Sequence, residues 1–299
     1  TDPAGMSPAT QLHEISRRTH QMAQQQSDSY MTIERELAAA NIRRVRAEEL
    51  TGAQAEHTFR AFEREMFPVL TPVACDNERD RSVLLTGNVL YVAVRLKGEA
   101  DSEARLAVVR LGKAVSRMVA LPVEHGGHAF ILIEDLVAHH IGLFFPGEKL
   151  LECRPFRLSR NADMSVREDL AGDLLAEMEA VLEARKRSGC VRLELDAGAT
   201  KVLESALVRM LGVPADSIYR CEHPIGFGFL SDLCDLGGVE SLLFERWPPQ
   251  LSPTLATATP MFASITDNDI LLYHPFDSFD PVVRFINEAA EDPDVLAIK

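Results

Sequence analysis

The residues best suited to do chemistry lie in two short stretches, each of which follows a predicted strand. The first stretch, Phe156–Asp163, places Arg157, Arg160, Asn161 and Asp163 just before a predicted helix N-terminus. Free backbone N–H groups and an arginine can converge on an anion at such a position, so Arg160 and Asn161 are candidate anion-binding residues. Alternatively, the two arginines pair with local carboxylates while the asparagine and the aspartate build the turn.

The second stretch runs from Tyr273 to Pro281, between a predicted strand and a predicted helix. Ligands of open α/β sheets bind at the carboxyl edge of the strands, which makes His274 a further candidate for an anion site. Ser278 or Asp280 can cap the helix that follows, and the proline suits its first turn. Capping and turn formation alone also explain most of these residues.

The standard catalytic motifs are missing. The sequence holds no P-loop, no G-x-S-x-G and no H-E-x-x-H, and Gly226–Gly228 starts like a dinucleotide-binding turn but no third glycine follows. His139 and His140 are adjacent, so on a helix they point about 100° apart, whereas a metal pair needs a spacing of four. We interpret them as surface or helix-end residues, and His125 and His128 as part of a hairpin-like loop. We therefore assign no catalytic residue and no metal ligand.

The cysteines are scattered singly, without a C-x-x-C pair. An odd, dispersed set argues against a disulfide framework and against a zinc site, so free thiols are expected. The five are Cys75, Cys153, Cys190, Cys221 and Cys234.

The formal net charge of the 299 residues is −14. A chain this acidic repels polyanions over its general surface, which disfavours nucleic-acid binding. Any anion site must therefore be local. No apolar run is long enough to span a membrane and no signal peptide opens the chain, so we expect a cytoplasmic protein.

The first part of the chain, residues 1–68, is predicted to be helical. Ser7 and Pro8 form a typical helix start, and a second helix starts at the capping box of Thr51 and Gln54 and ends at Pro68. Two long helices with few strands between them favour an antiparallel helical hairpin.

Residues 69–246 alternate between strand and helix patterns, which predicts an α/β domain. A capping box at Ser165–Glu168 predicts a helix that ends at Gly189, and a second helix is expected from Thr200 to Leu211. The predicted strands are 89–94, 106–109, 130–133, 150–158 and 191–195, with a short helix over 136–143 and a turn at Pro146–Gly147.

A proline-rich linker over residues 247–268 leads to a third part, residues 269–299. This part is predicted as strand 270–273, helix 281–291 and strand 295–298, the opening of a βαβ domain. The apolar run ends with the chain and Thr1 is no initiator methionine, so we expect an internal piece of a longer protein. The predicted fold class is thus α+β and multidomain.

Three segments resemble the polyphosphate kinases, which reversibly transfer the terminal phosphate of ATP to inorganic polyphosphate. They are Phe67–Ala74, Phe156–Asp163 and Tyr273–Lys299, and the resemblance extends from about Met6 to the end. It implies the latter part of an N-terminal helical domain, a head domain, and the start of the first of two phospholipase-D-like catalytic domains.

The resemblance also implies what this chain lacks. The family's phosphorylated histidine and its phosphate- and magnesium-binding arginines belong to segments beyond Lys299, and a nucleotide-binding asparagine belongs before Thr1, so none is carried onto a residue here. ATP and Mg²⁺ are expected for the parent enzyme but not for this chain alone. The resemblance implies a homodimer formed through the helical and head domains.

One departure and two alternatives remain. The loop Asn77–Ser82 differs from the family pattern and leaves the local structure there open. A stand-alone, non-catalytic regulatory or binding module related to the kinase is an alternative to an inactive enzyme fragment. A third hypothesis is an unrelated α/β ligand-binding domain that uses Arg160 or His274.

Overall fold

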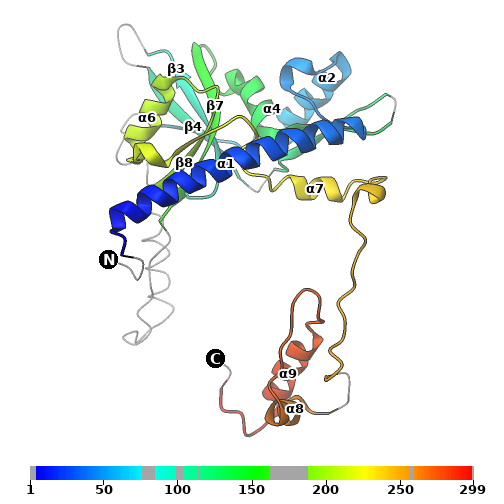
Figure 1. Ribbon diagram of the computed structural model, residues 1–299. Coiled ribbons are helices and arrows are strands. Elements are labelled where there is room, and N and C mark those ends of the chain that lie inside the picture. Colours follow the sequence, from blue (N-terminus) through cyan, green and yellow to red (C-terminus); the bar gives the residue numbers. More distant parts are fainter. Residues whose placement is uncertain are drawn as a thin grey trace. The chain divides into compact units, whose positions relative to one another are not determined.

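The computed structural model describes residues 5–75, 85–98, 104–112, 115–124, 126–161, 188–255 and 259–297 (Figure 1). The chain divides into two units, Thr1–Leu233 and Cys234–Lys299. The first unit holds both sheets, and each unit is described by itself.

The larger sheet has six strands in the order β2-β4-β3-β7-β8-β9. Its neighbours pair antiparallel except β8 and β9, which are parallel. A crossover that contains α6 (Lys201–Leu211) joins this parallel pair, as parallel neighbours require. The strands are β2 (Pro72–Ala74), β3 (Leu90–Leu96), β4 (Arg105–Leu111), β7 (Leu150–Arg160), β8 (Cys190–Asp196) and β9 (Ile218–Cys221).

Each face of this sheet covers a hydrophobic core, because side chains alternate along a strand. On one face, Val92 and Val94 of β3 pack with Leu136 of α4 (Ile133–His140). On the other face, Tyr91 packs with Leu203 of α6. Both cores belong to the first unit.

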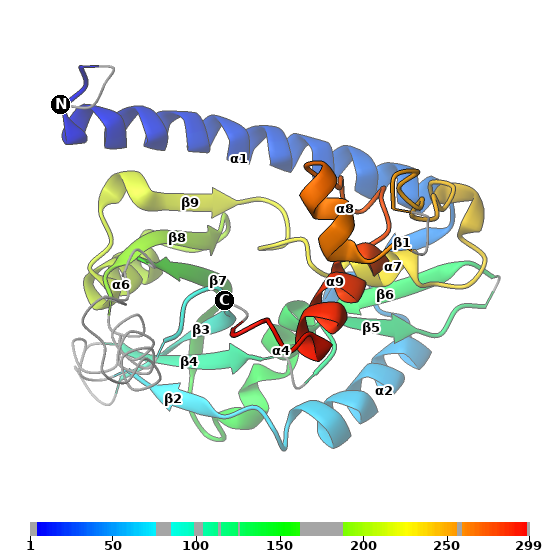
Figure 2. The same ribbon diagram turned by 90° about the horizontal axis from the view of Figure 1, so that it is seen from below.

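The smaller sheet has three strands in the order β1-β6-β5. β1 (Ile42–Arg44) pairs parallel with β6 (His128–Leu132), and β5 (Met118–Leu121) pairs antiparallel with β6. Helix α1 (Pro8–Ala39) contacts both β1 of this sheet and β9 of the larger one (Figure 2). The helix therefore connects the two sheets.

The helix starts follow their predicted caps. The Ser7 side chain accepts from the Thr10 N–H at the start of α1, and Thr51 and Gln54 form the capping box of α2 (Gly52–Ala61). Helix α2 continues into one π-helical turn, Phe62–Met66. The Thr200 side chain caps α6, and Gly212 ends it with a left-handed φ of 66°.

The predicted strands of the α/β region are confirmed as β3, β4, β6, β7 and β8, and the predicted helices as α4 and α6. The short strands β1, β2, β5 and β9 have three or four residues and were not predicted. The helix predicted from Ser165 and the loop Asn77–Ser82 lie outside the described residues.

The prediction that the first two helices form an antiparallel hairpin is wrong. Strand β1 follows α1 and joins the smaller sheet, and the main contacts of α2 are with the π-helical turn and β5. The main contacts of each helix are thus with other elements and not with the other helix.

The second unit contains α8 (Met261–Asp267) and α9 (Asp280–Glu291), which contact each other. Helix α9 confirms the helix predicted over 281–291. The short helices α7 (Leu230–Cys234) and η7 (Glu240–Leu242) lie near the division between the units.

The two strands predicted for the second unit are wrong. Residues 270–273 and 295–297 have no strand structure, and residue 298 lies outside the described range. An apolar run of strand length forms a strand only where a neighbour satisfies its backbone N–H and C=O groups. In this unit the described residues offer one isolated bridge, between Gln250 and Asp277.

Among the described residues, a search for helices that are both long and apolar enough to cross a bilayer finds none.

Candidate functional site

Arg160 and Asn161 lie together at the end of β7, where the sequence places them. The Arg160 side chain donates to the Leu85 carbonyl at 2.9 Å and to the Ser188 carbonyl at 2.5 Å, and the Asn161 N–H donates to the Gly189 carbonyl. These bonds connect β7 to the start of β8 and to residue 85. Asp163 and the predicted helix N-terminus lie outside the described residues.

His274 belongs to the second unit, whereas Arg160 belongs to the first. Its Nδ1 lies 3.0 Å from the Asp277 carbonyl oxygen, and its ring packs edge-on to Phe279 at 5.1 Å. The peptide bond to Pro275 is cis. The Ser278 hydroxyl accepts from the Asp280 N–H at 3.1 Å, so the helix-start role predicted for Ser278 is present.

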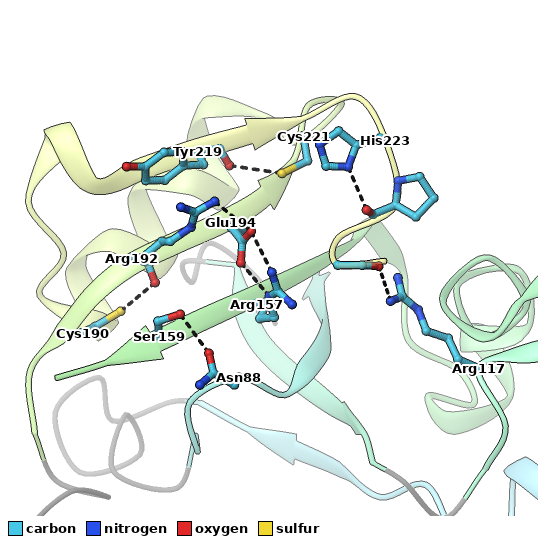
Figure 3. Close-up of polar contacts among 12 residues, drawn as sticks. Asn88, Arg117, Arg157, Ser159, Cys190, Arg192, Glu194, Tyr219, Cys221 and His223 are labelled. Carbon is cyan, nitrogen blue, oxygen red and sulfur yellow. Dashed lines mark hydrogen bonds and ion pairs between the residues drawn. The ribbon is translucent and has the colours of Figure 1, made fainter. Parts of the chain in front are cut away.

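A polar network is centred on Glu194 in β8, and the sequence did not single it out. Arg157 of β7 donates to both Glu194 carboxylate oxygens, at 2.6 and 2.9 Å, and Arg192 donates to one of them at 3.1 Å. Figure 3 shows these three side chains pointing toward one another from neighbouring strands, on the sheet face opposite α6. Arg157 therefore pairs with a carboxylate of the protein. This was the alternative to an anion site that the sequence analysis left open.

Glu194 is 5% exposed, and its carboxylate stays charged because of its partners. Burial by itself raises the pKa of Glu194, but the hydrogen bonds and charges of Arg157 and Arg192 outweigh burial and hold the pKa below its ordinary value. Two arginines share one buried carboxylate, which leaves one positive charge in surplus.

Tyr219 of β9 extends this network to α1. The Arg192 guanidinium lies 3.9 Å from the Tyr219 ring centroid and the His20 ring stacks on Tyr219 at 4.1 Å. Since both groups lie close to one centroid, they occupy opposite faces of the ring. The Thr19 and Tyr219 hydroxyls are hydrogen-bonded at 2.6 Å, so α1 is fixed to β9 by polar and aromatic contacts together.

In the run Gly226-Phe227-Gly228, the first glycine is required by the packing of the loop. Gly226 has a φ of 75°, and a Cβ added there would lie 2.5 Å from Arg157 Nη1. Its carbonyl accepts from Arg117 at 2.6 Å (Figure 3). Arg117 in turn is paired with the buried Glu134. A glycine is needed because two arginines approach this loop closely, not because a dinucleotide does.

A cleft of about 470 Å³ opens where β8 and β9 end and α1 passes. Its walls include His20, Gln24 and Cys221, together with His223, whose Nδ1 lies 2.8 Å from the Pro224 carbonyl. Cys221 is buried, and burial raises the pKa of its thiol to about 12, so it is a poor nucleophile.

The N-terminus of α6 is already occupied by a carboxylate of the chain. Glu152 accepts from the Thr200 N–H and from the Thr200 hydroxyl, both at 2.6 Å, and from Arg95 at 3.1 Å. Burial alone raises the pKa of Glu152, yet these bonds together hold it below the ordinary carboxyl value. The backbone N–H of Thr200 at this helix start is therefore already bonded to a carboxylate of the chain.

The adjacent histidines differ in environment. His139 is exposed, as predicted, but His140 is half-buried and contacts the rings of Phe59 and Phe62 at 5.5 and 4.9 Å. Burial, and then the neighbouring His139, lowers the pKa of His140. Both histidines lie in the last turn of α4, as the helix-end alternative predicted, and His140 is half-buried there.

The described residues bring together no group of three or more His, Cys, Asp or Glu side chains able to hold a metal ion. All five cysteines are free thiols, as predicted. The arginines of the Glu194 network are suited to holding the protein together and to attracting anions rather than to bond-breaking chemistry.

Two family models match the chain. Residues 53–233 match the polyphosphate kinase middle domain, and residues 260–299 match the polyphosphate kinase C-terminal domain 1. The first match alone covers more than half of the chain.

Curated relatives carry the same name. The chain is similar to the polyphosphate kinase of Rhodopirellula baltica, with 41% identity over 67% of this chain and 26% of the relative. It is 37% identical to the polyphosphate kinase of Halalkalibacterium halodurans over 99% of this chain and 43% of the relative. The chain thus spans less than half the length of these relatives.

A solved structure shares the fold. The polyphosphate kinase of Porphyromonas gingivalis matches with a TM-score of 0.65 and 22% identity, over 96% of this chain and 42% of that one. The third hypothesis, an unrelated ligand-binding domain, is therefore wrong: the chain belongs to the polyphosphate kinase family.

Proposed function

We propose that this chain is part of a polyphosphate kinase that reversibly transfers the terminal phosphate of ATP to inorganic polyphosphate. The observation that carries this proposal is the extent of the family match, which covers residues 53–233 and 260–299. The transfer proceeds through a phosphohistidine outside this chain, and ATP and Mg²⁺ are held by the whole enzyme.

The chain itself is scaffold and dimerisation region and is inactive alone. Phosphoryl transfer needs positioned cations and a nucleophile. Arg157, Arg117 and Arg160 are engaged with carboxylates or carbonyls, and the buried thiol Cys221 is poorly ionised. Arg160, Asn161 and His274 remain candidates for an anion contact in the whole enzyme, which acts in the cytoplasm.

The domain division proposed for the enzyme is a helical part over 1–68, a head domain over 69–246, a linker over 247–268 and the start of a catalytic domain over 269–299. The first two parts supply the homodimer interface. Light scattering on the purified chain is expected to give twice its mass of 33.1 kDa. A monomer at all concentrations tested would contradict the dimerisation role.

The activity proposal is tested by incubating the chain with ATP, Mg²⁺ and polyphosphate labelled in the terminal phosphate. We expect neither ADP formation nor a phosphohistidine on the chain. Acid-labile label on His274 would contradict the proposal, and the H274Q variant would identify that residue.

A further inference from the structure

A groove of about 530 Å³ lies between α6 and the adjoining strands β3 and β4 of the larger sheet. Three cations line it: Arg95 of β3, and Lys201 and Arg209 of α6. The rest of its wall is Leu106, Val202, Ser205 and small residues, and no described carboxylate lines it.

The cations keep partners inside the protein and still have donors to offer. Arg95 donates to Glu152 at 3.1 Å, and Lys201 donates to Glu204 at 3.0 Å while 80% of its side chain is exposed. Arg209 is exposed and also has a partner. A guanidinium has five N–H donors and an ammonium three, so one partner does not exhaust any of them.

The local charge is positive in an acidic chain. Glu204 also accepts from Arg220, so four cations, Arg95, Lys201, Arg209 and Arg220, stand against Glu152 and Glu204. The charge of these six groups is positive, whereas that of the whole chain is −14. Such a local excess meets the condition that the overall charge sets for any anion site.

The spacing of the cations favours an extended anion. Positions 201, 205 and 209 are four apart, so they line one face of α6, and Lys201 and Arg209 are separated by about 12 Å along the helix axis. A single phosphate cannot contact both ends of such a row. A linear chain of phosphates can contact Arg95 and Lys201 at one end and Arg209 at the other.

We propose that the groove formed by Arg95, Lys201 and Arg209 binds linear polyphosphate. The proposal rests on the proposed function, which makes polyphosphate a substrate of the whole enzyme, and it places one anchoring site for that substrate on the first unit. Binding is electrostatic and therefore weakens as salt is added.

The test is titration of the purified chain with fluorescent linear polyphosphate, with orthophosphate, ATP and a single-stranded oligonucleotide as competitors. K201Q/R209Q is expected to weaken polyphosphate binding by roughly tenfold or more, since charge-assisted contacts to phosphate are lost. The matched control is R17Q/R60Q, which removes two exposed arginines, each paired with a glutamate like Lys201, outside the groove. The control is expected to change affinity by less than about twofold.

Four results would overturn the site: no binding of polyphosphate, equal weakening by the two double variants, or competition by the oligonucleotide or by ATP as strong as by polyphosphate. Strong competition by the oligonucleotide would make the groove a nucleic-acid surface, and strong competition by ATP would assign it to nucleotides. The assay involves no phosphoryl transfer, so its failure leaves the proposed function standing. Circular dichroism checks that each variant is folded.

Discussion

Glu194 is the residue on which the polar network of the larger sheet depends, because it is the carboxylate among the described residues that pairs with both Arg157 and Arg192. Replacing it as E194Q leaves two half-buried guanidinium groups facing a neutral amide. We expect the free energy of unfolding to fall by about 2–4 kcal/mol, measured by urea denaturation at neutral pH. E14Q is the control, since Glu14 has the same kind of arginine partner at an exposed site; a similar loss in both variants would contradict the role of burial.

The same residue makes stability depend on pH. The folded pKa of Glu194 lies below its unfolded value of 4.5, so its stabilisation is present above pH 4.5 and is lost as the pH falls through the folded pKa. The wild-type chain should therefore lose stability more steeply in acid than E194Q does. Thermal unfolding of both proteins is measured at pH values from 7 to 3. An equal loss of stability with falling pH in the two proteins would refute this linkage.

A substitution of Gly226 tests whether the close approach of two arginines to its loop requires a glycine. A methyl group at this position meets Arg157 Nη1 and also strains a backbone with φ of 75°, so G226A should destabilise the chain by about 1–3 kcal/mol. Gly228 is two residues away with open space around it, so G228A should be nearly neutral in the same thermal melts. Equal losses would show that the loop needs glycine only for flexibility.

At the scale of elements, α6 depends on Thr200 and on the carboxylate of Glu152. The T200A variant loses the cap to the Leu203 N–H and the hydroxyl bond to Glu152, which should cost about 1–2 kcal/mol of stability. T200S keeps the hydroxyl and should recover most of the loss. If T200S is as unstable as T200A in denaturant titrations, the methyl group and not the hydroxyl matters.

The elements that could be predicted are those with strong local signals. Strands such as β3 and β7 are rich in β-branched or apolar residues, and α6 has both a threonine cap and a terminating glycine. Strands β1 and β9 could not be predicted, because each has three or four residues and exists through pairing with β6 or β8. The runs 270–273 and 295–297 show the converse, since an apolar pattern without a paired neighbour gives no strand.

The candidate site residues also divide into those that a local sequence pattern predicts and those that depend on tertiary contacts. Arg160 and Asn161 were placed correctly at the end of β7, because a strand followed by polar turn residues is a local pattern. The Glu194 network joins β7, β8 and β9 with α1, over nearly 200 residues of sequence, and no local pattern reveals it. The one signal that could have revealed part of it is the alternation of Arg192 and Glu194 with buried leucines.

At the scale of the whole molecule, the second unit, Cys234–Lys299, contains an exposed, non-helical segment over residues 243–250. Phe244 is fully exposed and Trp247 is 69% exposed, so the chain between residues 243 and 250 is accessible to a protease. Trypsin should cut after Arg246 and leave a fragment that contains the first unit. R246Q should lose this cut alone, as seen by mass spectrometry; a resistant Arg246 in the wild type would contradict an accessible segment.

We propose that this chain supplies the scaffold of a polyphosphate kinase and not its transfer chemistry. A decisive test compares the chain alone with a chimera in which it replaces the matching 43% of the Halalkalibacterium halodurans relative. Both are assayed for polyphosphate formation from ATP and for ATP formation from polyphosphate. We expect an inactive chain and a chimera active in both directions; turnover by the chain alone, or a folded chimera without activity, would contradict the proposal.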